Sequence, residues 1–151
     1  LEQITANATE AALEYKPAGK WSVKEQIGHL SLLEPLWRQR IQDIQNAKPV
    51  LTAADLENKA TFEAEFNNSS ISTLLQQFTD ERSSTLSLFK ETDGQDMAAT
   101  SMHPRLQRPM RIIDHAYFIA EHDEHHIARI KEITIVFQSF SHATGEISRF
   151  I

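Results

Sequence analysis

Apolar residues recur every three or four positions along long segments of this chain, and this periodicity predicts helices. The clearest segment begins at Ser22, where Ser22 and Glu25 form a capping-box pattern, and its apolar side chains continue to Ile44. Residues that break helices and form turns are scarce, with Gly 4 and Pro 5 among 151 residues. The pattern is typical of an all-α domain and disfavours a β-sandwich, which needs many turns.

The chain is long enough for one domain with one core, and we expect four main helices. Their expected ranges are 2–14, 22–46, 70–90 and 109–137, with Pro109 as the first residue of the last helix. Residues 1–137 would form the bundle, and residues 138–151 a tail or a short helix of the same domain.

The segments between these helices are less regular. Thr52 to Asp55 could cap a short helix within residues 50–69, and Asp93-Gly94 is expected to turn the chain. On the third helix, the predicted buried face is Ile71, Leu74, Leu75, Phe78, Leu86 and Phe89.

The net charge and the composition disfavour some classes of binding partner and metal site. The formal net charge is −6 and no cluster of Lys and Arg occurs, which disfavours nucleic acid. No apolar run approaches the ~18 residues of a membrane helix, so no membrane insertion is expected. The absence of cysteine leaves His and carboxylates as the strong metal ligands, and agrees with a cytoplasmic protein.

The last predicted helix places histidines where a bundle helix normally carries apolar residues. In a seven-residue repeat, Ile112, Ile119, His126 and Ile133 share one inward position, and His115, His122, Arg129 and Val136 share its partner. A buried imidazole without hydrogen-bond partners costs of order 1–3 kcal/mol, so several on one seam require an explanation.

His122 and His126 lie one helical turn apart and can converge on one ion if a third ligand comes from another helix. On the residues alone, histidines satisfied by carbonyls, carboxylates or water are an equally good interpretation. Asp123 stands where zincin proteases carry Glu, and no second carboxylate-histidine motif supports a di-iron site.

Two segments resemble the DinB-like superfamily. Residues 21–30, W-S-V-K-E-Q-I-G-H-L, are similar to its first motif, and residues 122–130, H-D-E-H-H-I-A-R-I, are similar to its second. The spacing between them, the His103-Pro104 turn and the number of helices also agree, over about residues 1–136. The resemblance implies an up-down-down-up four-helix bundle whose metal ligands are His29, His122 and His126.

The same resemblance implies one divalent ion, zinc or nickel, with water in the open positions. Relatives of known activity are transferases and isomerases that use a low-molecular-weight thiol such as bacillithiol or mycothiol. It also implies a small-molecule substrate and a homodimer.

Other residues near these motifs have weaker cases. His115 and Glu25 are candidates for residues that support the ligands, although burial explains the first and capping the second. His125 should face solvent, His103 should be structural, and Trp21 should be a packing anchor. Arg105, Arg108 and Arg111 could hold an acidic substrate or cofactor, although surface solvation is the simpler interpretation. His142 lies in the uncertain tail.

Three neutral imidazoles would leave the ion its charge and an open position, as in catalytic zinc sites. A bound water would then give hydrolysis, and a bound thiolate would give thiol transfer. No catalytic side chain is assigned. The leading hypothesis is therefore a metal-dependent enzyme, either a thiol S-transferase or a hydrolase. The alternatives are a metal-binding protein without turnover and an interaction module whose histidines bind nothing.

Overall fold

The computed structural model describes residues 1–92 and 98–147, with side chains described as far as residue 137. In chain order its elements are α1 (Glu2–Thr5), α2 (Glu10–Glu14), α3 (Val23–Gln45), α4 (Lys59–Glu63), the 3₁₀ helix η1 (Phe66–Asn68), α5 (Ile71–Glu91), β1 (Ser101–Met102), β2 (Pro109–Met110) and α6 (Ile112–Ile147). The turn expected at Asp93-Gly94 lies outside the described residues. Every helix that is described is too short or too polar to cross a membrane.

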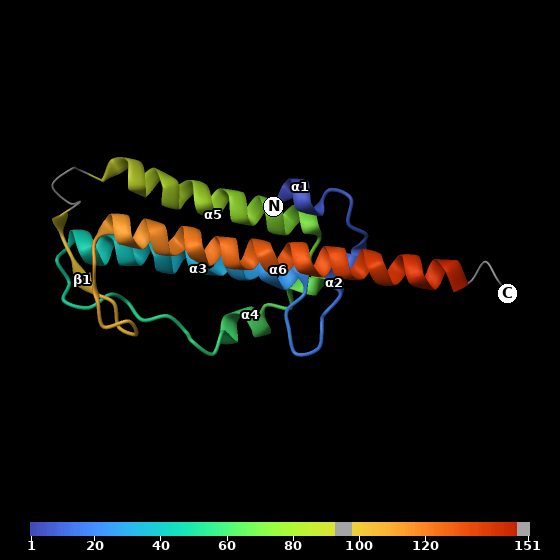
Figure 1. Ribbon diagram of the computed structural model, residues 1–151. Coiled ribbons are helices and arrows are strands. Elements are labelled where there is room, and N and C mark those ends of the chain that lie inside the picture. Colours follow the sequence, from blue (N-terminus) through green and yellow to red (C-terminus); the bar gives the residue numbers. More distant parts are fainter. Residues whose placement is uncertain (93–97, 148–151) are drawn as a thin grey trace.

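The long helices of the bundle are α3, α5 and α6, and the short helices α1 and α2 lie at the end where α3 and α5 begin, with α2 packed on α3 and α6 (Figure 1). Helices α3 and α5 run in the same direction, and α6 returns antiparallel to both. Two parallel neighbours need a long return connection, which here contains α4 and η1. The expected up-down-down-up four-helix bundle is confirmed.

Local capping explains where the long helices begin. Ser22 accepts a hydrogen bond from the backbone N–H of Glu25, whose carboxylate accepts one from the N–H of Ser22, so the predicted capping box is present. Ser70 caps α5 in the same way through the N–H of Thr73. Both starts agree with the expected ranges.

The expected first helix, residues 2–14, is interrupted and becomes α1 and α2. Thr9 adopts an extended backbone and its hydroxyl accepts from the N–H of Ala12, so it begins a new helix. Threonine side chains compete in this way with continuation of a helix.

The start predicted for the last helix is wrong. Pro109 belongs to β2, where it lies opposite Met102 of β1, and α6 begins three residues later at Ile112. The carboxylate of Asp114 accepts a hydrogen bond from the N–H of Arg111 just before that start. Pairing of Pro109 and Met110 with the short strand β1, which the helical periodicity does not indicate, explains the difference.

The last helix also ends later than expected. The backbone of α6 continues past residue 137 to Ile147, so the boundary proposed for a tail falls inside one helix. Proline, the residue that most strongly breaks helices, does not occur after Pro109.

The short helix expected within residues 50–69 is present as α4, and the Asp55 carboxylate accepts a hydrogen bond from the N–H of Lys59 at its start. One expectation for the buried face of α5 differs from the structure. Leu86 is 49% exposed, and Thr85 occupies the buried position instead because its hydroxyl donates to Glu34.

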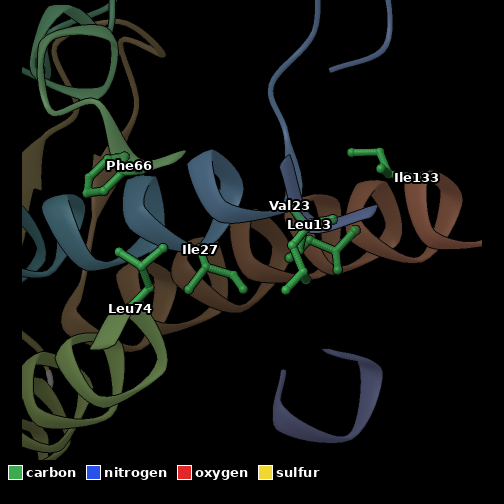
Figure 2. Close-up of a cluster of buried hydrophobic side chains, with 7 residues drawn as sticks. Leu13, Val23, Ile27, Phe66, Leu74 and Ile133 are labelled. Carbon is green, nitrogen blue, oxygen red and sulfur yellow. The ribbon is translucent and has the colours of Figure 1, made fainter. Parts of the chain in front are cut away.

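One apolar cluster holds the return connection against α3. Its buried members are Leu13, Val23, Ile27, Phe66, Leu74, Ile130 and Ile133 (Figure 2). A Cβ atom on Gly28 would lie 2.4 Å from the ring of Phe66, so only glycine lets this ring lie directly on α3. The contact fixes the connection beside the helical turn that carries His29.

Candidate metal centre

The structure brings together the three histidines predicted as metal ligands. His29 of α3 and His122 and His126 of α6 each place one ring nitrogen within 4.8 Å of the others. The Nε2 atoms of His122 and His126 are 3.2 Å apart. His29 and His126 are 4% and 6% exposed, and His122 is half-buried. The antiparallel packing of α3 and α6 makes this meeting possible.

The opposite ring nitrogens of two of these histidines have protein partners. Nδ1 of His29 lies 2.9 Å from the Thr61 hydroxyl, and Nδ1 of His126 lies 2.5 Å from the side-chain oxygen of Gln26. An amide oxygen only accepts, so His126 donates from Nδ1 and keeps a lone pair on Nε2. Metal-binding histidines are normally held in this way through the nitrogen that does not bind the ion.

Burial keeps the three rings neutral. It lowers the pKa of His29 to about 4, with a smaller contribution from His122. It lowers the pKa of His126 to about 3, helped by the positive charge that neighbouring histidines would carry. The pKa of His122 is lowered mainly by burial as well. At pH 7 all three are therefore in the form that binds metal.

The geometry of the pair on α6 fits a metal ion. Two nitrogens bound to one tetrahedral zinc ion, each at about 2.0 Å, lie about 3.3 Å apart. Nδ1 of His122 is buried and has no hydrogen-bond partner among the described residues, whether its Nε2 binds an ion or donates to His126. The 3.2 Å spacing of the two Nε2 atoms and the nearby ring nitrogen of His29 fit a divalent ion.

The open side of the cluster faces a cavity of about 520 Å³. Its walls include the three histidines, the apolar side chains Trp21, Leu33, Trp37 and Phe118, and the polar side chains Arg40, His103 and Arg105. The Trp21 ring packs 4.6 Å from the ring of His29. A cavity of this size, with few polar groups on apolar walls, is typical of a small-molecule site.

The family model of the DinB superfamily matches residues 1–130. This chain belongs to the DinB superfamily. No curated protein matches the chain.

One solved structure extends the family match to three dimensions. YfiT from Bacillus subtilis, described as a probable metal-dependent hydrolase with an unusual four-helix bundle topology, superposes with a TM-score of 0.75. The sequences are 18% identical, and the match covers 91% of this chain and 79% of that chain. At this identity the likeness establishes the fold.

Other residues singled out from the sequence are not members of the three-histidine cluster in this DinB-superfamily chain, although the ring of His125 lies 5.4 Å from that of His126 and lines the cavity. The Glu25 carboxylate is used by the N–H of Ser22 and by Lys16, so it serves as a helix cap. His115 is completely buried, with its ring 5.5 Å from that of Trp37. His125 is exposed, as predicted.

The loop before α6 contributes more to the cavity than the sequence suggested. His103 is buried and lines the cavity, and Arg105 lines it as well. Arg111 is instead paired with Asp114 at the surface, and Arg108 is exposed. The side chain of His142 lies outside the described residues.

Three residues of the site were missed by sequence reasoning. Gln26 precedes His29 by one helical turn, so its position offered a signal. Arg40 interrupts the apolar stripe between Trp37 and Ile44, which is also visible in the sequence. Thr61 comes from the irregular return connection, and no local pattern indicates its role.

Proposed function

We propose that this DinB-superfamily protein is a metal-dependent enzyme in which His29, His122 and His126 hold one divalent ion, zinc or nickel. The observation that carries the proposal is the convergence of three neutral imidazoles at the wall of a small-molecule cavity. Structural zinc sites are usually closed by four protein ligands, whereas catalytic sites keep a position open. Among the described side chains, the cluster contains three ligands and no fourth.

The ion would supply Lewis-acid chemistry to a substrate oxygen or sulfur atom. The residues of this chain would do the rest. Gln26 and Thr61 would orient the ligand rings, and the apolar side chains of Trp37 and Phe118 would exclude water from the reacting groups. Hydrolysis is the first reaction to test, since YfiT is described as a probable metal-dependent hydrolase. Transfer to a low-molecular-weight thiol such as bacillithiol or mycothiol is the second.

Elemental analysis of protein purified without a metal-affinity column tests the metal centre. The parent should contain nearly one zinc or nickel ion per chain, and His122→Ala should contain little, because it loses a ligand. His125→Ala is the matched control, since this exposed neighbour should leave the metal content unchanged. Equal metal in parent and His122→Ala would contradict the ligand assignment. So would the absence of metal after incubation with zinc, nickel and manganese.

Turnover is tested separately with the metal-loaded parent. Esters and amides test hydrolysis, and electrophiles mixed with a small thiol test transfer. Loss of activity in His122→Ala, without recovery when metal is added, would support a metal-dependent enzyme. A stoichiometric ion with no turnover in either screen would favour the metal-binding protein without catalysis.

A further inference from the structure

Arg40 is a buried cation with no carboxylate in direct contact among the described residues, although the charge of Asp43 favours its charged form. Its side chain on α3 is 2% exposed, and its Nε donates to the backbone oxygen of Thr52 over 2.8 Å. Asp43, one turn further along α3, is occupied by Lys48 and by the N–H of Thr52. No ion pair among the described residues includes Arg40. Since buried charges are normally paired, this guanidinium is expected to meet an anion.

His103 offers a second donor beside Arg40. Its Nδ1 accepts hydrogen bonds from the backbone N–H groups of Arg105 and Leu106, at 3.2 and 3.1 Å. A ring nitrogen that accepts carries no proton, so the neutral ring carries its proton on Nε2. That Nε2 lies 3.4 Å from Nη1 of Arg40. Two donors facing each other cannot satisfy one another, and both need an acceptor.

Both donors line the cavity that contains the histidine cluster, and Arg105 adds a further positive charge to its wall. Trp37 links the two regions. The centroid of its indole is 5.5 Å from the ring of His122 and 5.5 Å from Cζ of Arg40. The guanidinium therefore lies within twice that distance of the His122 ring. One small molecule can reach both.

We propose that Arg40 and His103 bind the carboxylate or phosphate group of the substrate, whose apolar part lies along Trp37 and whose reacting group lies at the histidine cluster. The planar guanidinium can donate two parallel hydrogen bonds to such an anion, and His103 adds a third donor. The position of the reacting group rests on the proposed function. The anion site itself needs no metal.

Calorimetric titration of the metal-free parent with acetate and with inorganic phosphate tests the anion site. At least one anion should bind with a dissociation constant of about 1 mM or tighter. Arg40→Gln should weaken that binding at least about tenfold. Arg111→Gln is the matched control, because Arg111 is an arginine outside the cavity. Binding of acetate alone identifies a carboxylate, and binding of phosphate alone identifies a phosphate. No saturable binding, or equal binding by both variants, would overturn the proposal.

Two further measurements guard against a variant that fails to fold. In the ¹⁵N-labelled parent, the anion should shift the side-chain signals of Arg40 and His103 more than that of Arg111. Larger shifts elsewhere would count against the site. His126→Ala should keep anion binding while losing metal, and Arg40→Gln should keep metal. Failure of the metal centre and failure of the anion site are therefore distinguishable.

Discussion

Two clusters of buried polar side chains lie between α3 and the helices packed against it, and they differ in how completely their groups are paired. In the first, Glu34 is fully buried and accepts hydrogen bonds from Arg82 and Thr85 of α5. Arg82 also donates to both carboxylate oxygens of Asp123 of α6. We call these four residues the Glu34 cluster. Every charge in it has a partner.

The cavity side of α3 is the opposite case. The three clustered histidines, Arg40 and His103 all line one cavity, and each keeps a ring nitrogen or guanidinium N–H groups beyond those used in the protein contacts described above. Asp123 and His122 are adjacent on α6 yet belong to different sides. The comparison teaches that buried polarity by itself does not mark a ligand site. Polar groups left unpaired at a cavity do indicate a ligand site, whereas a fully paired set is explained by its contribution to stability.

The largest expected effect concerns the Glu34 cluster. Glu34→Ala leaves part of the charge of Arg82 unpaired and removes the carboxylate acceptor of the buried Thr85 hydroxyl, which keeps only longer contacts with Arg38 and the backbone oxygen of Glu81. The free energy of unfolding should therefore fall by about 3 kcal/mol, as measured by urea denaturation of the metal-free protein. The zinc content should stay unchanged, since the cavity side does not depend on this cluster.

Glu81→Ala provides the matched control. Glu81 also pairs with an arginine, Arg38, but its side chain is 41% exposed. Removing it should cost less than about 1 kcal/mol, because exposed ion pairs contribute little. Equal losses for the two variants would show that pairing in the Glu34 cluster has no special role in stability.

Zinc binding should raise the free energy of unfolding, and this gain should not depend on the Glu34 cluster. At a free zinc concentration of about 100 times the dissociation constant, the parent should gain about 2.7 kcal/mol, seen as a higher melting temperature. Glu34→Ala should gain the same amount, and His126→Ala should gain almost none. Stabilisation of His126→Ala equal to that of the parent would mean that zinc binds elsewhere.

The parts of the fold that depend on local patterns were predicted from the sequence. The start at Ser22 follows from its capping box and the start at Ser70 from helical periodicity, and both are confirmed. The errors occur where distant residues decide. Pro109 pairs with a strand that the helix pattern does not reveal. Thr85 takes the buried position in place of Leu86, because Glu34 of another helix binds the Thr85 hydroxyl.

Only part of the candidate site could be predicted from the sequence. The spacing of His122 and His126 indicated a shared face, but only the family resemblance selected His29 as their partner. Arg40 was overlooked although it stands within an apolar stripe, where a charge is unusual. Thr61 could not be found, because its position beside His29 depends on how the irregular connection packs on α3.

Acid should lower the free energy of unfolding through the buried histidines of the bundle. His115 lies outside the cavity lining, so its substitution tests this effect and leaves the proposed metal ligands unchanged. Burial lowers the pKa of His115 from 6.5 to about 4, with a further contribution from the charge of Arg40. Between these values the unfolded chain binds a proton that the folded one does not, so stability falls as the pH falls. His115 should account for up to about 1.4 kcal/mol per pH unit.

His115→Phe should remove this contribution from the metal-free protein. The measurement is urea denaturation at several pH values between about 6.5 and 4.5, chosen to lie between the two pKa values. The curve of the variant should fall less steeply than that of the parent. Parallel curves would mean that His115 does not contribute to acid sensitivity.

The smallest expected effect tests whether an irregular connection can hold a metal ligand in place. Thr61→Val keeps the shape of the side chain but removes the hydroxyl that lies 2.9 Å from Nδ1 of His29. Zinc affinity, measured by competition with a chelator, should fall about tenfold, because the ring loses the contact that fixes its orientation. Thr79→Val, at an exposed position of α5, is the matched control and should leave affinity unchanged. If both variants bind zinc as the parent does, the packing of α3 and α6 alone orients His29. The two helices, and not the connection that contains Thr61, would then determine the positions of the metal ligands.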